Sequence, residues 1–340
     1  MKIKSINIKN FKSIVDITIN EPNPFTVFVG PNGSGKSNIF EALEFSYYNF
    51  LSSSLSSENE KKESPEYVLS MFGGKEDILN FKKLGSLTVN INAEQDGIIN
   101  LTDDRGFIEI IIGRAIKIEK DTTTVFIDKG SLFGFFKKFI RIFIGNKEKQ
   151  RINYSDGTKL SFSCDNLEKV LKRLLENPEK REKISEWLEL FIPEFDRIEV
   201  QKSEFSSDEN LLIYQKHYKR PFNKELISDG TYNIIALLTA VYQSDEPQFL
   251  CIEEPENGLN PYVIRKLVDF FRNACTEKRH YIWLNTHSQT LVECLEPEEI
   301  IVVDKINGET QIKQIKGMNL HGLDMAEVWL SGALGGGTPW

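Results

Sequence analysis

The N-terminal stretch of the sequence alternates apolar and polar positions with the period of two that is typical of β-strands. This pattern predicts strands over residues 2–11 and 14–19. The run Phe25-Thr26-Val27-Phe28-Val29 is continuously apolar, as in a strand buried on both faces of a sheet. Apolar residues then recur with helical spacing, which predicts a helix that begins near Lys36.

The middle of the chain breaks this pattern. Residues 51–66 are rich in serine and charge and almost lack apolar side chains, which is typical of a loop. Between Ser86 and Phe162, short β-type runs alternate with turn signals, and this predicts an inserted meander. We expect Asp165 to cap a helix with one apolar face, and Asn177-Pro178 to end that helix and start another.

After Phe195 the pattern returns to alternating strands and helices. The predicted helices begin after Ser228 and Pro261, and the predicted strands and terminal hairpin cover residues 249–252, 281–284 and 300–315. The chain therefore falls in the α/β class. Its expected parts are an α/β domain in two pieces with a β-rich and helical subdomain inserted between them, over residues 1–50, 201–340 and 51–200.

Composition excludes several classes of protein. With 340 residues, of which 40% are hydrophobic and 27% charged, the chain can bury a sizeable core and is neither disordered nor collagenous. No apolar run approaches the ~18 residues of a membrane span, and the opening is typical of a strand and not of a signal peptide. The four cysteines form no C-x-x-C pair, so a zinc ribbon or a disulfide framework is not expected. We expect a cytoplasmic protein that does not bind membranes.

The net charge of −8 argues against a surface that coats nucleic acid. One local stretch is different, because Phe133 to Ile140 is densely aromatic and six Lys or Arg face a single acid between Lys137 and Arg151. Two interpretations stay open. The stretch could bind nucleic acid, or its aromatic residues could pack in a core and leave a solvated basic face.

A glycine-rich segment carries the strongest chemical signal. Gly30-Pro31-Asn32-Gly33-Ser34-Gly35-Lys36-Ser37 matches G-x-x-x-x-G-K-[ST] between a predicted buried strand and a predicted helix. Such a loop curls so that backbone N–H groups point at phosphate oxygens. The Lys36 ammonium would meet the β- and γ-phosphates, and the Ser37 hydroxyl would be a ligand of Mg²⁺.

Adjacent carboxylates follow a second apolar strand, in the run Glu253-Glu254-Pro255-Glu256. Carboxyl ends of strands are where nucleotide-binding α/β folds place their ligands. One carboxylate could hold hydrated Mg²⁺ and the next could orient an attacking water. The alternative is a pair of solvated glutamates that open a loop.

Two further segments have a functional and a structural interpretation. Ser228-Asp229-Gly230-Thr231 precedes an apolar helix, so it could form an anion site or merely cap that helix. His287 follows a predicted buried strand, where it could sense a phosphate or serve the structure alone.

The order of these motifs resembles that of ABC-type ATPase heads of the SMC/RecF branch. Within that branch the chain looks closest to AAA-family ATP-binding proteins related to OLD nucleases. The opening Ile8-Lys9-Asn10-Phe11-Lys12-Ser13 and the tail from Ala326 to Gly336 resemble the same group. The resemblance covers about residues 1–50 and 220–340, and the middle matches by position only.

The resemblance implies an ABC-type P-loop NTPase head with a mixed β-sheet and an inserted α+β subdomain. It also implies a homodimer that sandwiches two ATP molecules, with Ser228 and Gly230 of one copy facing the loop of the other. Glu254 falls at the catalytic base, and His287 falls at the γ-phosphate sensor. Ser37 and Glu253 fall at the Mg²⁺ ligands, although the family more often has Asp at the second position. The residues implied to bind ATP are Lys12, Gly30, Pro31, Asn32, Gly33, Ser34, Gly35, Lys36, Ser37, Asn38, Ser228, Asp229, Gly230 and Asn257.

By the same resemblance we expect an Mg²⁺-dependent ATPase. No heptads lie between Lys36 and Ser228, so no coiled-coil arm is expected, and too few residues follow His287 for the nuclease domain of OLD relatives. The expected role is an ATP-driven switch that controls a separate effector, such as a nuclease or toxin, in bacterial anti-phage defence. A RecF-like DNA-binding ATPase of repair or recombination is the alternative, and the ATPase subunit of a membrane transporter is a third.

Overall fold

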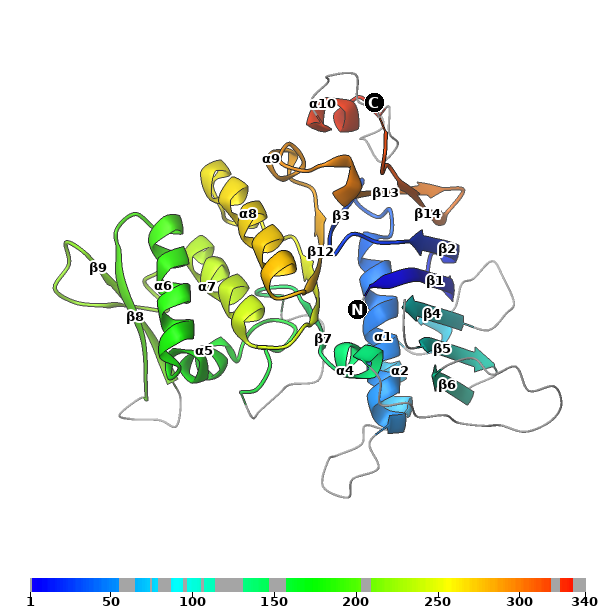
Figure 1. The fold of residues 1–340 in the computed structure, drawn as a ribbon, viewed down its shortest axis with the longest axis horizontal. Coiled ribbons are helices and arrows are strands. Elements are labelled where there is room, and N and C mark those ends of the chain that lie inside the picture. The colour runs from blue at the N-terminus through cyan, green and yellow to red at the C-terminus, as the bar shows by residue number, and fades with distance from the viewer. Residues whose placement is uncertain are drawn as a thin grey trace. The chain divides into compact units, whose positions relative to one another are not determined.

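The computed structural model describes residues 2–54, 65–73, 75–78, 87–93, 97–104, 107–113, 131–146, 157–202, 209–318 and 325–332. The chain divides into two compact units (Figure 1). Unit 1 is Met1–Phe139 with Tyr281–Trp340, and unit 2 is Ile140–His280. This division differs from the predicted boundaries at residues 50 and 200.

Unit 1 is built on a mixed β-sheet. Its strands follow the order β6-β5-β4-β1-β2-β14-β13-β3-β12. Their bounds in chain order are β1 Ile3–Phe11, β2 Ile14–Asn20, β3 Phe25–Val29, β4 Leu87–Ala93, β5 Gly97–Asp104, β6 Phe107–Gly113, β12 Tyr281–Thr286, β13 Ile300–Ile306 and β14 Glu309–Gln314. The strand β3 pairs in parallel with β12 and β13, and all five of its residues are buried, as its apolar run predicts.

Helix α1 (Lys36–Ser54) packs on this sheet, where it contacts β1, β4 and β6. The Phe28 ring contacts the Phe40 ring of α1 edge-on at 5.4 Å and the Trp283 ring at 5.2 Å. Aromatic pairs of this kind bury large apolar areas, and they anchor the start of α1 beside the end of β3. The shorter helices of unit 1 are α2 Pro65–Met71, α3 Lys75–Ile78, α4 Ser131–Phe136, α9 Gln289–Val292, η1 Pro297–Glu299 and α10 Met325–Leu330.

The predicted meander exists, but it belongs to this sheet. Strands β4, β5 and β6 pair antiparallel in succession, and β4 also pairs with β1 through partners such as Ile8 and Val89. An unpaired edge of β1 would expose backbone N–H and C=O groups, and β4 satisfies them. The first part of the expected insertion is therefore an extension of the N-terminal sheet.

The loop expected over residues 51–66 is partly helical. Leu51–Ser54 completes the last turn of α1, and α2 begins at Pro65. The remainder of that prediction, residues 55–64, lies outside the described residues. Serine and charge are compatible with a helix end, so composition alone placed this boundary too early.

The aromatic stretch after Phe133 packs in the core. Phe135, Phe136 and Phe139 are buried, and Tyr47 of α1 contacts both Phe136 and Phe139. This finding supports the core interpretation of these rings. The basic residues Lys147, Lys149 and Arg151 lie outside the described residues.

Unit 2 combines a strand pair, a small sheet and four of the longer helices. Strand β11 (Phe249–Glu253) neighbours β7 (Phe139–Ile142), and β8 to β10 form an antiparallel three-stranded sheet. Helices α6, α7 and α8 lie side by side (Figure 1). The bounds of the remaining elements are α5 Leu167–Leu175, α6 Pro178–Phe191, β8 Phe195–Lys202, β9 Glu209–Gln215, β10 Phe222–Asn223, α7 Asp229–Tyr242 and α8 Pro261–Glu277.

Three helices of unit 2 begin at a side chain that accepts a backbone N–H. Asn177, Ser228 and Asn260 cap α6, α7 and α8 in this way, and the first two were predicted. The predicted cap Asp165 is wrong. Helix α5 begins one residue later with Asn166 at its N-cap, because the Asp165 carboxylate accepts the Ser161 hydroxyl instead.

The four cysteines are free thiols. No helix in the described part of the chain combines the length and apolar character needed to cross a bilayer.

Candidate functional site

The glycine-rich loop lies between the end of β3 and the start of α1, as predicted. Gly33 and Gly35 have φ angles of +76° and +106°, which side-chain-bearing residues rarely adopt. A Cβ at Gly30 would lie 2.1 Å from the Val303 carbonyl oxygen, and one at Gly35 would lie 2.0 Å from the Thr310 hydroxyl. These glycines let the loop curl tightly against β13 and β14, with α1 starting at its end.

Two polar side chains of the loop, Lys36 and Ser34, are suited to bind an anion. The Lys36 ammonium is almost buried and donates to the carbonyl oxygens of Gly30 at 2.7 Å and Pro31 at 3.0 Å. The Ser34 hydroxyl is buried and has no hydrogen-bond partner in the described structure. A buried hydroxyl without a partner is costly, and a phosphate oxygen would satisfy it. The loop therefore fits the phosphates of a nucleotide.

Hydrogen bonds among Ser13, Asn38 and Thr310 connect the phosphate loop to β14 and α1. Thr310 of β14 donates to the Ser34 carbonyl oxygen at 2.9 Å, and its hydroxyl lies 2.6 Å from that of Ser13. Asn38, expected to contact the nucleotide, donates its amide to the Ser13 hydroxyl at 2.7 Å. Sequence reasoning missed Ser13 and Thr310, because no local pattern indicates that β14 reaches the loop.

Lys12 is engaged with α1. Its ammonium forms an ion pair with the buried Glu41 carboxylate, and its backbone, in the left-handed region at φ 48°, donates to the Ile78 carbonyl oxygen. The structure thus places Lys12 beside the first turns of α1, where the Glu41 carboxylate is its counter-ion.

The predicted sensor histidine follows β12. Thr286 pairs with Val29 in the parallel ladder, so His287 and Gly30 are the next residues at the same edge of the sheet. His287 is exposed. The preceding Asn285 is buried and donates to the Ser37 hydroxyl at 3.4 Å, a contact that the sequence analysis did not find.

Unit 2 carries the predicted carboxylates at the end of β11. Glu253 is buried, and its Oε1 accepts hydrogen bonds from two guanidinium nitrogens of Arg141 on β7, with the Nε contact at 2.6 Å. The Arg141 guanidinium also lies 5.1 Å from the Phe162 ring centroid. The carboxylate predicted to hold Mg²⁺ therefore already has a cationic partner.

Glu254 differs from its neighbour. It is half-buried, its backbone is left-handed at φ 47°, and its carboxylate accepts the Asn257 amide at 3.0 Å. A non-glycine residue in this conformation is strained, and such strain concentrates at functional sites.

The turn after Glu254 packs against the start of α7. A Cβ at Gly230 would lie 2.3 Å from the Gly258 carbonyl oxygen, and Asn233 donates to the Asn257 carbonyl oxygen at 2.6 Å. Within unit 2, the structure thus brings together the predicted residues Glu254, Asn257 and Gly230. Ser228 and Asp229, at the end of the same helix, are exposed.

The described residues fit the phosphates of a nucleotide better than they fit Mg²⁺. The loop offers phosphates an unpaired hydroxyl, a lysine and a helix N-terminus. Mg²⁺ needs oxygen ligands at about 2.0–2.1 Å. Glu253 does not fit direct ligation while Arg141 is bonded to it, and no cluster of three or more His, Cys, Asp or Glu suited to a metal occurs in the described ranges.

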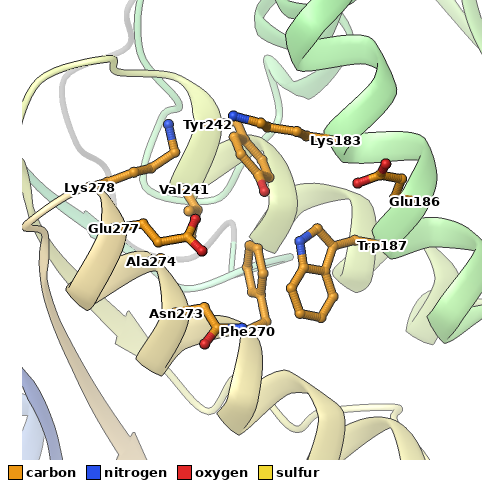
Figure 2. Close-up of a pocket in the computed structure, with 10 residues that line it drawn as sticks. All are labelled: Lys183, Glu186, Trp187, Val241, Tyr242, Phe270, Asn273, Ala274, Glu277 and Lys278. Atoms are coloured by element: carbon orange, nitrogen blue, oxygen red, sulfur yellow. The ribbon is translucent and has the colours of Figure 1, made fainter.

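A cavity of about 250 Å³ lies among α6, α7 and α8 (Figure 2). The rings of Trp187, Tyr242 and Phe270 line it together with two lysines and two glutamates, Lys183, Lys278, Glu186 and Glu277. None of the residues predicted to bind nucleotide or metal lines this cavity.

The mixed sheet, the phosphate loop at the end of β3 and the carboxylates at the end of β11 define a P-loop ATPase head of the ABC type. Comparison with known proteins supports this class. The SMC head domain from Thermotoga maritima superposes with a TM-score of 0.52 at 16% identity, over 93% of this chain and 100% of that one. An SMC head bound to the C-winged helix domain of ScpA gives a TM-score of 0.54 at 15% identity, over 92% of this chain and 97% of that one.

The chain belongs to the family described as "AAA domain, putative AbiEii toxin, Type IV TA system", which matches residues 25–293. An ATP/GTP phosphatase of Helicobacter pylori is 22% identical over 334 residues, covering 86% of this chain and 87% of that protein. The chromosome partition protein Smc of Methanocaldococcus jannaschii is 51% identical over 43 residues, which is 13% of this chain but 4% of that protein. The chain thus spans a small part of the length of the Smc relatives. These findings confirm the predicted fold class and the resemblance to SMC/RecF-like ATPase heads.

Proposed function

We propose that this chain is an Mg²⁺-dependent ATPase whose dimer closes around ATP and controls a separate effector protein. The observation that carries the proposal is the loop from Gly30 to Ser37. Its buried Ser34 hydroxyl has no hydrogen-bond partner among the described residues, and its Lys36 ammonium donates to two carbonyl oxygens of the loop. Both groups would gain a charge-assisted hydrogen bond from a phosphate.

Each predicted residue has a role in this proposal. The loop and α1 bind the phosphates, and the Ser37 hydroxyl would be a ligand of Mg²⁺, which neutralises charge on the phosphates. The predicted role of Glu253 as a second Mg²⁺ ligand requires that its carboxylate be free of Arg141. Glu254 orients the attacking water, and His287 contacts the γ-phosphate. Ser228, Asp229, Gly230 and Asn257 complete the site from the second copy.

The proposed cellular role is bacterial anti-phage defence in the cytoplasm. The description of the family names an AbiEii toxin and a type IV toxin–antitoxin system, which supports an effector that acts as a toxin. The solved SMC head with ScpA supports the idea that heads of this fold engage a separate protein. The DNA-repair alternative loses the support of its aromatic stretch, because Phe135, Phe136 and Phe139 are buried.

The test is ATP binding by calorimetry, with Mg²⁺ present, for the wild type and for Lys36→Ala. We expect affinity to fall by at least about 100-fold, because charge-assisted hydrogen bonds are worth about 1.5–3 kcal/mol each. Lys183→Ala is the matched control, since Lys183 forms an exposed ion pair with Glu179. Equal affinity of the wild type and Lys36→Ala, with circular dichroism unchanged, would refute the proposal.

A further inference from the structure

The turn between β9 and β10, residues 216–221, carries a cluster of cationic and aromatic side chains. Its first five residues are Lys216, His217, Tyr218, Lys219 and Arg220, and all five are exposed. The chain as a whole is acidic, with a net charge of −8. A positive segment on such a chain is a local feature, which the overall composition does not predict.

The cations of this turn are not matched within unit 2. Lys216, Lys219 and Arg220 form no ion pair with any other residue that the structure describes. Three unmatched cations within five residues repel one another, and an anionic partner would relieve that repulsion.

The carboxylates beside the turn already have partners. The turn lies next to the start of β8, because Phe195 pairs with Gln215 in the ladder. There the Glu194 carboxylate lies 3.4 Å from the His217 ring. The other two carboxylates, those of Asp196 and Glu199, form ion pairs with Arg197. The positive charge of the turn therefore remains available to a ligand.

Tyr218 presents an aromatic ring among these cations. Its side chain is 60% exposed, and its ring contacts the Phe222 ring edge-on at 5.1 Å. The backbone N–H of Tyr218 donates to the Gln215 carbonyl oxygen at 3.1 Å, and Phe222 pairs with Ile213 in the ladder. A ring held in this way loses little conformational freedom when a flat group stacks on it.

We propose that the turn of residues 216–221 binds single-stranded nucleic acid. The cations of Lys216, Lys219 and Arg220 contact phosphates, and a base stacks on the Tyr218 ring. This combination of cations and an exposed ring is how proteins bind single strands. A duplex keeps its bases stacked inside, and an acidic protein would use the cations alone. The inference goes beyond the proposed ATPase function and uses unit 2 only.

The first experiment tests the ring. Binding of fluorescent oligothymidylate and oligouridylate of about 15 nucleotides is measured by anisotropy without ATP. Tyr218→Ala should weaken binding at least about fivefold, the lower end of what the loss of one base–aromatic stack costs. Tyr218→Phe keeps the ring and should bind as the wild type does. Tyr262→Ala is the matched control, because Tyr262 is 57% exposed elsewhere in unit 2.

The second experiment tests the cations through the salt dependence of binding. Each phosphate contact to a single strand contributes about −0.7 to the slope of log affinity against log salt concentration, so three contacts predict about −2. Lys219→Ala should reduce the slope by about 0.7. Lys183→Ala is the control and should leave the slope unchanged, since Lys183 is an exposed lysine paired with Glu179.

The outcomes are decisive in both directions. A fall in affinity confined to Tyr218→Ala, with a smaller salt slope in Lys219→Ala, supports the proposal, and the tighter of the two oligonucleotides identifies DNA or RNA as the ligand. The proposal is overturned if Tyr218→Ala, folded by circular dichroism, binds as the wild type does. It is also overturned if a duplex of equal length or a polyglutamate peptide binds the wild type more tightly. Lys36→Ala should bind the oligonucleotides normally, so failure of the ATPase proposal would leave this result unchanged.

Discussion

At the scale of single residues, Glu254 combines a strained backbone conformation with a carboxylate at the end of β11. Its φ of 47° costs conformational energy, while its carboxylate is half-buried and accepts one amide from Asn257. Glu254→Gln keeps the size of the side chain and removes the charge that polarises water. We expect ATP turnover to fall about 10²–10⁴-fold with ATP binding retained. Turnover is measured by phosphate release and binding by calorimetry.

Glu253→Gln is the informative comparison. It removes the charge that faces Arg141 and leaves a buried guanidinium without its counter-ion, which costs about 3–5 kcal/mol. We expect a lower free energy of unfolding and a weakened response to Mg²⁺, neither of which should occur in Glu254→Gln. If turnover is near wild type in Glu254→Gln and lost only in Glu253→Gln, the two carboxylates have the reverse roles.

His280 makes the stability of unit 2 sensitive to pH. The imidazole is fully buried, and burial lowers its pKa from 6.5 to about 4. Its Nδ1 accepts the Gln248 N–H at 3.3 Å, and its Nε2 lies 3.1 Å from the Val241 carbonyl oxygen, which together suit the neutral ring. If the ring were protonated, its Nδ1 would also carry a hydrogen, which would face the backbone N–H of Gln248.

Since the folded pKa is depressed, the stabilisation is complete above pH 6.5 and is lost as the pH falls towards 4. The pKa difference corresponds to about 3 kcal/mol at 1.36 kcal/mol per unit. Urea unfolding at pH 7.5 and pH 4.5 should show a smaller loss of stability in His280→Gln than in the wild type. His217→Gln, at an exposed histidine, should follow the wild type. A wild-type pH profile in His280→Gln would contradict this assignment.

At the scale of elements, the terminal hairpin of β13 and β14 supports the phosphate loop. Thr310→Val keeps the shape of the side chain but removes the hydrogen bond to the Ser34 carbonyl oxygen and the contact with Ser13. An unpaired buried carbonyl costs about 1–3 kcal/mol. We expect a comparable loss in the free energy of unfolding and an ATP affinity about tenfold weaker.

The matched control is Thr276→Val, which removes an exposed hydroxyl that bonds within α8. Calorimetry and thermal unfolding of both variants separate the two effects. If Thr310→Val loses stability but binds ATP as the wild type does, the hairpin supports the fold and not the loop.

At the scale of the whole molecule, the proposed dimer predicts complementation between two inactive variants. Lys36→Ala disables the phosphate loop, and Ser228→Arg blocks the exposed start of α7 where the second copy would present it. Each variant alone should lack ATPase activity. An equal mixture should recover about a quarter of wild-type activity, because half of the two-fold dimers are mixed and each mixed dimer has one intact site.

Mixed dimers are verified first, with two affinity tags and a pull-down in the presence of ATP. Lys183→Ala in place of Lys36→Ala serves as the reference, since its loop is intact. If mixed dimers form and remain inactive, Ser228 does not act across a dimer.

Local pattern was sufficient to predict most elements and the two motif-bearing loops. The apolar run of β3, the glycine spacing of the loop and the caps of α6 and α7 are short-range features, and the structure has them where they were expected. Backbone geometry at glycines and caps depends on neighbours a few residues away, so the sequence by itself determined them. It likewise determined the class of ATPase head, through the order of its motifs.

Only the tertiary structure decided which distant residues meet. Strand β4 pairs with β1 and so belongs to the N-terminal sheet. Thr310 donates a hydrogen bond to the Ser34 carbonyl oxygen, although the two residues are far apart in the sequence. The Arg141 side chain is buried against Glu253. A basic stretch in the sequence looks the same whether its arginine faces water or a buried carboxylate. Whether the arginine is buried beside a counter-ion depends on which strand neighbours its own strand, here β11 beside β7. No local sequence pattern contains that information.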